Sequence, residues 1–211
     1  MKKLIVTVLA AAMLLIPVGN HAHAEVQQAA HIPEELYAQA LGAQAPAQMS
    51  VSAAMGPAIH AMLLAMMHQN VQTFDHDDPV LVWESLYNLL SLYGQLDGRA
   101  EVSDGTLHLH SESVHDFAAA LAVDPLQLGL PGADLADRMC YGSESDLDLL
   151  SCGEDELAGV VGQVESAQED TLVLTGKLVY LVDDSPLCTF RARLQLQDNM
   201  FGYAITALEL V

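Results

Sequence analysis

The histidines of this sequence are the residues that most directly suggest metal chemistry. His108 and His110 stand two residues apart in a segment that alternates like a β-strand, a spacing that predicts both imidazoles on one face. His76 lies in an acidic run, Asp75-His76-Asp77-Asp78. Imidazole and carboxylate groups are ligands for Zn²⁺, Cu²⁺ and Ni²⁺, so the pattern predicts a divalent-metal site at His108, His110 and His76. A solvated strand edge is the alternative, because two histidines at this spacing are a weak signal.

Soft and cationic side chains offer two further kinds of site. Met55, Met62 and Met66 share one helical face and carry thioethers that suit Cu(I), although methionines at this spacing more often pack a core. Arg191 and Arg193 lie two apart in a predicted strand, which favours an anion-binding stripe. Cross-strand pairing of these arginines with the many acidic residues is the alternative.

The three cysteines, Cys140, Cys152 and Cys188, cannot all pair within one chain. A Cys140–Cys152 disulfide is the prediction, because these residues flank a polar stretch, and the bridge would add ~3 kcal/mol. Pairings of Cys188 with either of the others remain open, since sequence does not fix connectivity.

Charge narrows the classes of partner. The chain has 211 residues, with 7 Lys and Arg against 28 Asp and Glu, a net charge of −21. Nucleic acids and anionic membrane surfaces both require a basic footprint, so this composition argues against them.

The N-terminus has the pattern of a bacterial secretory signal peptide. Lys2 and Lys3 precede an apolar run, Leu4 to Val18, and Ala22-His23-Ala24 supplies small residues for cleavage before Glu25. We therefore expect a periplasmic or secreted protein, with no membrane segment after cleavage. Because the removed residues carry two cations and no acid, the mature chain has a net charge of −23.

The rest of the chain predicts helices first and strands last, an α+β fold in which N-terminal helices pack on a C-terminal four-stranded antiparallel meander. Three regions are expected: the signal peptide (1–24), an N-terminal helical segment (25–78) and an α+β domain (79–211). Helices are predicted at 51–70, 80–92 and 112–123, a hairpin at 101–110, a loop-rich insertion at 124–156, and strands at 157–166, 171–182, 187–197 and 201–211.

This order of elements over residues 80–211 resembles the NTF2-like group of cystatin-like folds. The resemblance rests on element order and lengths, without a residue motif. It implies a pocket between helices and sheet, and frequent dimerisation through the sheet. It also implies that His115, Asp116, Tyr180 and Tyr203 are the acid–base groups to seek in that pocket. Alternatively, His115 and Asp116 are the exposed first turn of a helix.

The functional expectation is a non-enzymatic binding or interaction module for a small ligand or a protein partner. The sequence contains no nucleophile elbow, P-loop or dinucleotide-binding motif, which leans the prediction away from an enzyme. An NTF2-like pocket enzyme, either a hydrolase or an isomerase, is one alternative. A divalent-metal binder is the other, because bound cations would relieve the acidic charge.

Overall fold

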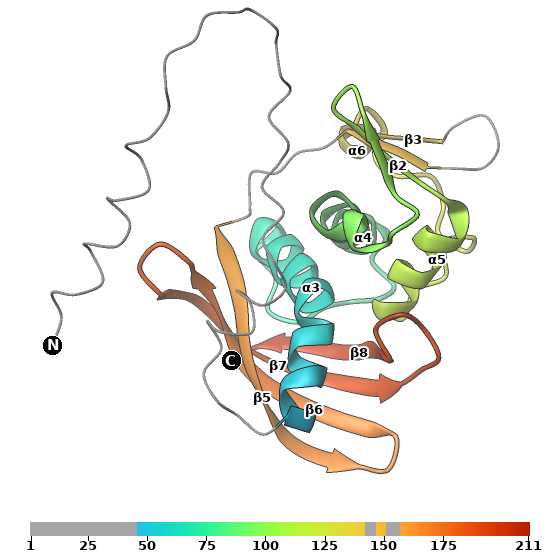
Figure 1. The fold of residues 1–211 in the computed structure, drawn as a ribbon. Coiled ribbons are helices and arrows are strands. Elements are labelled where there is room, and N and C mark those ends of the chain that lie inside the picture. Colours follow the sequence, from blue (N-terminus) through green and yellow to red (C-terminus); the bar gives the residue numbers. More distant parts are fainter. Residues whose placement is uncertain (1–45, 142–146, 151–156) are drawn as a thin grey trace, which may run out of the picture. The chain divides into compact units, whose positions relative to one another are not determined.

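The computed structural model describes residues 46–141, 147–150 and 157–211. Its C-terminal part is an antiparallel sheet of β5 (Ala158–Gln168), β6 (Thr171–Tyr180), β7 (Ser185–Leu196) and β8 (Tyr203–Leu210), in that spatial order (Figure 1). Each strand pairs with the next, and the connections between them are short, spanning 169–170, 181–184 and 197–202. At the β8 edge, Thr73 bridges to Glu209, so that a short N-terminal segment extends the sheet.

The core lies on one face of this sheet. The inward side chains of β6 and β7 are apolar and buried, as at Leu174, Leu178, Phe190 and Leu194. They belong to one hydrophobic cluster with the residues of α3 (Pro46–Gln69), which packs along β5 (Figure 1). A lone sheet leaves its apolar face wet, so this packing stabilises both elements.

The helix α3 is apolar around most of its circumference because it contacts α4 on one side and the sheet on another. It is the one helix in the described part of the chain that is long and apolar enough to cross a membrane. Met55, Ile59, Met62 and Met66 are all at most 1% exposed within the protein core, and a buried helix passes the same test of composition.

The helix α4 (Pro79–Tyr93) begins where its sequence predicts. The Asp78 carboxylate accepts a hydrogen bond from the Val80 backbone N–H at 2.9 Å, and Pro79 occupies the first turn, where no N–H is needed. Trp83 and Leu86 point into the core. A short 3₁₀ helix, η1 (Gly94–Leu96), follows directly.

A second, smaller sheet lies in the middle of the chain. Its order is β1 (Glu101–Ser103), β2 (Thr106–Leu109), β4 (Leu147–Leu150) and β3 (Met139–Tyr141), all antiparallel. Asp104-Gly105 forms the β1–β2 turn with positive φ at both residues, as expected for a two-residue hairpin. The helices α5 (Ser111–Ala120) and α6 (Ala133–Ala136) separate β2 from β3.

The predicted α+β class and the C-terminal meander are confirmed. The prediction of a loop-rich insertion at 124–156 is incomplete, because this segment also contains β3 and β4. The strand β4 pairs with β2 on one side and with β3 on the other. The helix predicted at 51–70 is α3, which begins earlier, at Pro46, and continues through Pro57. Since α3 and the sheet share one core, the described part of segment 25–78 packs together with 79–211.

Candidate functional site

The outward face of the C-terminal sheet carries the candidate site. Side chains alternate along each strand, most clearly in the middle of β7, where Arg191 and Arg193 are exposed and point away from α3 while Phe190, Ala192 and Leu194 are buried. We call this surface the open face, because no element in the described ranges covers it. Its members are Val161, Gln163, Glu165, Val173, Thr175, Lys177, Thr189, Arg191, Arg193, Gln195, Ala207 and Glu209.

The open face differs in charge from the rest of the chain. It holds three of the 7 Lys and Arg residues, namely Lys177, Arg191 and Arg193, but only two of the 28 acidic residues, Glu165 and Glu209. On a chain with a net charge of −21, this face is therefore the one where another acidic surface meets the least repulsion.

The charged side chains of this face are only partly satisfied. Arg191 donates from Nε and Nη2 to the two carboxylate oxygens of Glu165, at 3.1 and 3.2 Å. Arg193 and Glu209 are diagonal neighbours on β7 and β8, because Arg193 pairs with Ala207 in the register. Neither of their side chains makes a hydrogen bond or ion pair with any described residue.

A shallow hollow of about 150 Å³ lies between these charges. Small side chains create it, since Ala207 faces Arg193 and Val173 lies on the other side of β7. Arg191, Glu209 and Thr73 complete the lining of this hollow. Arg193 and Glu209, which pair with no residue in the described ranges, therefore lie around a floor that includes Val173, Ala192, Ala207 and Leu208.

An apolar corner adjoins the charged part of the open face. Val161 is 49% exposed and shares a row with Lys177 and Thr189, and the Val211 backbone N–H bonds to Thr189. Leu181 is also 49% exposed and lies over Gly159, where an added Cβ would come within 2.8 Å of its Cδ2. Exposed large apolar side chains gathered on one surface are typical of interaction sites.

The predicted metal ligands do not converge. His108 lies in β2 and contacts Ser103, whereas exposed His110 lies beyond that strand and caps α5. His76 bonds through Nε2 to the Ile205 carbonyl of the other sheet, at 3.0 Å. Within the described residues, no three His, Cys, Asp or Glu side chains are arranged to hold a metal ion.

The predicted acid–base residues are also dispersed. His115 is exposed in the first half of α5, and Asp116 lies 3.7 Å from the Arg99 guanidinium, so both occupy a helix surface. Tyr180 pairs with Ser185 and Tyr203 with Leu196, at opposite ends of β7. At ~3.3 Å per residue, these two tyrosines lie roughly 35 Å apart along the sheet.

A buried carboxylate lies near these helix residues. Asp97 accepts hydrogen bonds from Arg99 Nε and Nη2, at 3.0 and 2.7 Å, and Arg99 also bonds Glu112. The Arg99 hydrogen bonds hold the pKa of the Asp97 carboxyl well below its usual range. We interpret this group as a structural ion pair that ties the loop before β1 to α5.

The described methionine and cysteine residues that the sequence singled out lie mainly in packed surroundings. Met55, Met62 and Met66 are fully buried in the core, which accounts for them as packing residues. Cys188 is a half-buried free thiol on β7, and burial raises its pKa. Cys140 lies in β3, but Cys152 lies outside the described residues, so their pairing stays a prediction.

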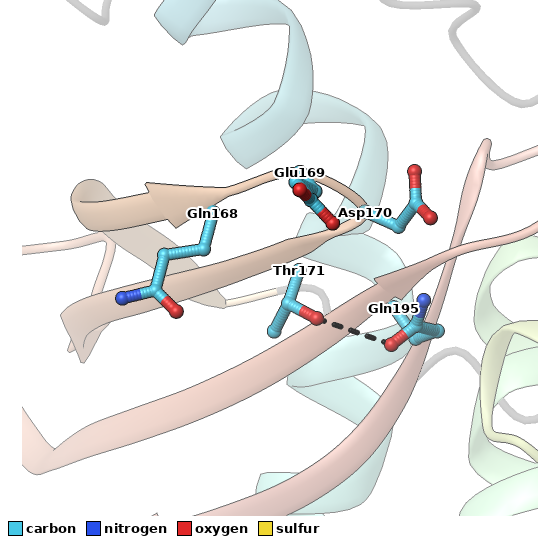
Figure 2. Close-up of a pocket in the computed structure, with 5 residues that line it drawn as sticks. All are labelled: Gln168, Glu169, Asp170, Thr171 and Gln195. Atoms are coloured by element: carbon cyan, nitrogen blue, oxygen red, sulfur yellow. Dashed lines mark hydrogen bonds between the residues drawn. The ribbon is translucent and has the colours of Figure 1, made fainter.

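A larger hollow lies at the β5–β6 turn. Figure 2 shows its five lining residues, with Thr171 Oγ1 donating to Gln195 Oε1 at 3.1 Å and the carboxylates of Glu169 and Asp170 carried by the turn. Its volume is about 550 Å³, but every acidic residue there is exposed to solvent. It therefore has no buried polar group that would fix a ligand.

Sequence reasoning found Arg191 and Arg193 but missed their surroundings. The strand register and the bridge at the β8 edge place Glu165, Glu209 and Thr73 near these arginines, and neither feature can be derived from the sequence. Period-two alternation places Glu165 on the outward side of β5, which is the one signal that the sequence offers.

No protein-family model, curated protein or solved structure matched this chain.

Proposed function

We propose that this chain is an exported, non-enzymatic interaction module that binds a protein partner on its open face. The observation that carries the proposal is the uncovered sheet face with three cations and an apolar corner, on a chain with a net charge of −21. Arginine and exposed aliphatic side chains are typical of protein interfaces, in which polar groups surround an apolar centre. The flat shape of the face suits a macromolecule better than a small ligand.

Export is part of the proposal and rests on the N-terminal pattern of the sequence. The expected mature chain starts at Glu25. Intact-mass measurement of the protein recovered from the extracellular or periplasmic fraction tests this directly. A mass corresponding to residues 25–211 supports export with cleavage, and a full-length mass in the cytoplasm alone contradicts it.

Site-specific photo-crosslinking tests the binding face. A benzophenone amino acid replaces Gln163 or Lys177 on the open face, and exposed Ala53 on α3 or Asp137 after α6 in matched controls. The proposal expects intermolecular adducts from the first pair and at least fivefold fewer from the second. The proposal would be overturned if adducts formed equally at all four positions, or if every crosslink were intramolecular and left the mass of a single chain.

A further inference from the structure

The hollow on the open face has opposite charges in its lining. Arg193 on β7 and Glu209 on β8 both line it, and neither side chain pairs with any residue in the described ranges. Arg193 is opposite Ala207 in the register, so Glu209 is its diagonal neighbour, ~7–8 Å away. Arg191 also lines the hollow, but its guanidinium is already bound to the Glu165 carboxylate. The hollow therefore offers one guanidinium and one carboxylate to a ligand.

These two charges determine which class of ligand fits. Glu209 repels a simple anion that approaches Arg193, and the net charge of −21 on the chain adds to that repulsion. A simple cation at Glu209 leaves the Arg193 guanidinium unpaired. A ligand that carries both a carboxylate and an ammonium satisfies both side chains through charge-assisted hydrogen bonds of ~2.8 Å, and it has no net charge.

The size and floor of the hollow restrict the ligand further. Its volume is about 150 Å³. At ~30 Å³ per molecule, that volume corresponds to about five waters, which is close to the size of glycine or alanine. The floor includes Val173, Ala192, Ala207 and Leu208, so the carbon atoms of a small amino acid would meet apolar side chains.

We propose that this hollow binds a small α-amino acid as its zwitterion, with the carboxylate at Arg193 and the ammonium at Glu209. The inference goes beyond the proposed function, because it adds a small-molecule site to the open face. Although that face is flat overall, the hollow is concave on the scale of such a ligand. Glu209 is directly opposite Arg191 in the register, so the ion pair of Arg191 with Glu165 is what leaves Glu209 available.

The expected binding is weak. Arg193 and Glu209 are both exposed, so water competes for their hydrogen bonds. A ligand of about six non-hydrogen atoms also has few contacts from which to gain affinity. We therefore expect a dissociation constant on the order of 1–10 mM, at which the site responds to amino acids only where they are abundant.

NMR titration of the isotopically labelled full mature chain with L-alanine tests the site. At constant pH and ionic strength, we expect saturable shifts of the backbone amides of 191–193 and 207–209. Acetate and methylamine each carry only one of the two charges and are expected to bind about tenfold more weakly, or less. The inference would be overturned if no saturable shift appeared up to ~100 mM alanine, or if acetate bound as well as alanine.

Variants at the hollow locate the binding. Arg193→Gln and Glu209→Gln each remove one charge, and each is expected to weaken alanine binding by about fivefold or more. Ala207→Leu fills the hollow from an exposed position and is expected to abolish binding, while circular dichroism verifies the fold. Glu101→Gln, on an exposed acid of the other sheet, is the matched control and should keep the affinity of the parent. Alanine binding that survives Ala207→Leu would also refute the site.

The two proposals for the open face fail separately. The crosslinking positions Gln163 and Lys177 lie outside the hollow, so they detect a protein partner whether or not an amino acid binds. Crosslinks without alanine binding would refute the amino acid site and leave the interaction module standing. Alanine binding without crosslinks would support the site and refute the module.

Discussion

Glu165 on β5 and Arg191 on β7 form a two-pronged ion pair across the intervening strand β6, with N···O distances of 3.1 and 3.2 Å. The register between β5 and β6 shifts at this point, so that Glu165 is the extra residue of a β-bulge. A β-bulge changes the direction of the side chain that it carries, and here the Glu165 carboxylate extends across β6 to Arg191. The same contact leaves Arg193 as the arginine of β7 that is available to a partner.

Replacing Glu165 with Gln should lower stability only slightly. Its carboxylate and the Arg191 side chain are 44% and 47% exposed, and exposed pairs contribute about 0.2–1 kcal/mol. Urea unfolding of E165Q at low and high salt measures the loss, which should shrink at high salt because the pair is screened. A loss above about 2 kcal/mol would mean that the pair is effectively buried.

Gly176→Ala should destabilise the fold substantially. Gly176 faces the core opposite Phe190, and an added Cβ would lie 2.4 Å from the Val161 carbonyl oxygen and 2.7 Å from Phe190 Cζ. Relief requires backbone movement, so we expect a loss of about 1–3 kcal/mol in the free energy of unfolding. Gly98→Ala, where nothing lies within 4 Å, is the matched control and should be close to neutral. Equal effects in both variants would contradict the packing around Phe190.

Asp97→Asn should lower stability at neutral pH by about 1–3 kcal/mol, because it weakens hydrogen bonds to a charged partner. The Arg99 hydrogen bonds lower the pKa of Asp97 in the folded protein below its ordinary value of 3.8. The unfolded chain therefore takes up the proton first as pH falls, so this contribution is complete above about pH 4 and declines below it. Urea unfolding at pH 7, 4 and 3 should show the variant and parent converging towards acid; a constant difference would refute the assignment.

The Cys188 thiol should react slowly in the folded protein. Burial raises its pKa above the ordinary 9.0, so less thiolate is present at pH 8 than in an exposed cysteine. We expect at least tenfold slower alkylation by iodoacetamide than in the urea-unfolded chain, as followed by peptide mass spectrometry. Equal rates in both states would show that the start of β7 opens freely.

The parts of the fold that sequence predicted well are those specified locally. The middle of β7 alternates cleanly between buried and exposed side chains, and the turn between β6 and β7 carries Asp183-Asp184-Ser185. Likewise, Asp78 and Pro79 mark the start of α4 through short-range capping. These signals depend only on residues that are close in the sequence, so they can be interpreted without the tertiary structure.

The missed elements depend on distant partners. The strands β3 and β4 are only three and four residues long, and β4 exists because β2, about forty residues earlier, offers it an edge. The helix α3 continues through Pro57 because burial on several sides outweighs the lost hydrogen bond. At the site, the sequence indicated Arg191 and Arg193, but the pairing of Arg191 with Glu165 occurs at a bulge that alternation does not predict.

The position of α3 also has a consequence for the order in which the protein can fold during synthesis. This helix is completed about ninety residues before β5 begins, yet it shares one hydrophobic core with Phe190, Leu194 and Ile205. The meander itself consists of sequential hairpins and needs few distant contacts, so it should form rapidly once it emerges. Until the sheet has been synthesised, the apolar surface of α3 that it covers in the folded protein stays exposed. The nascent chain would therefore gain from a chaperone that shields exposed apolar segments.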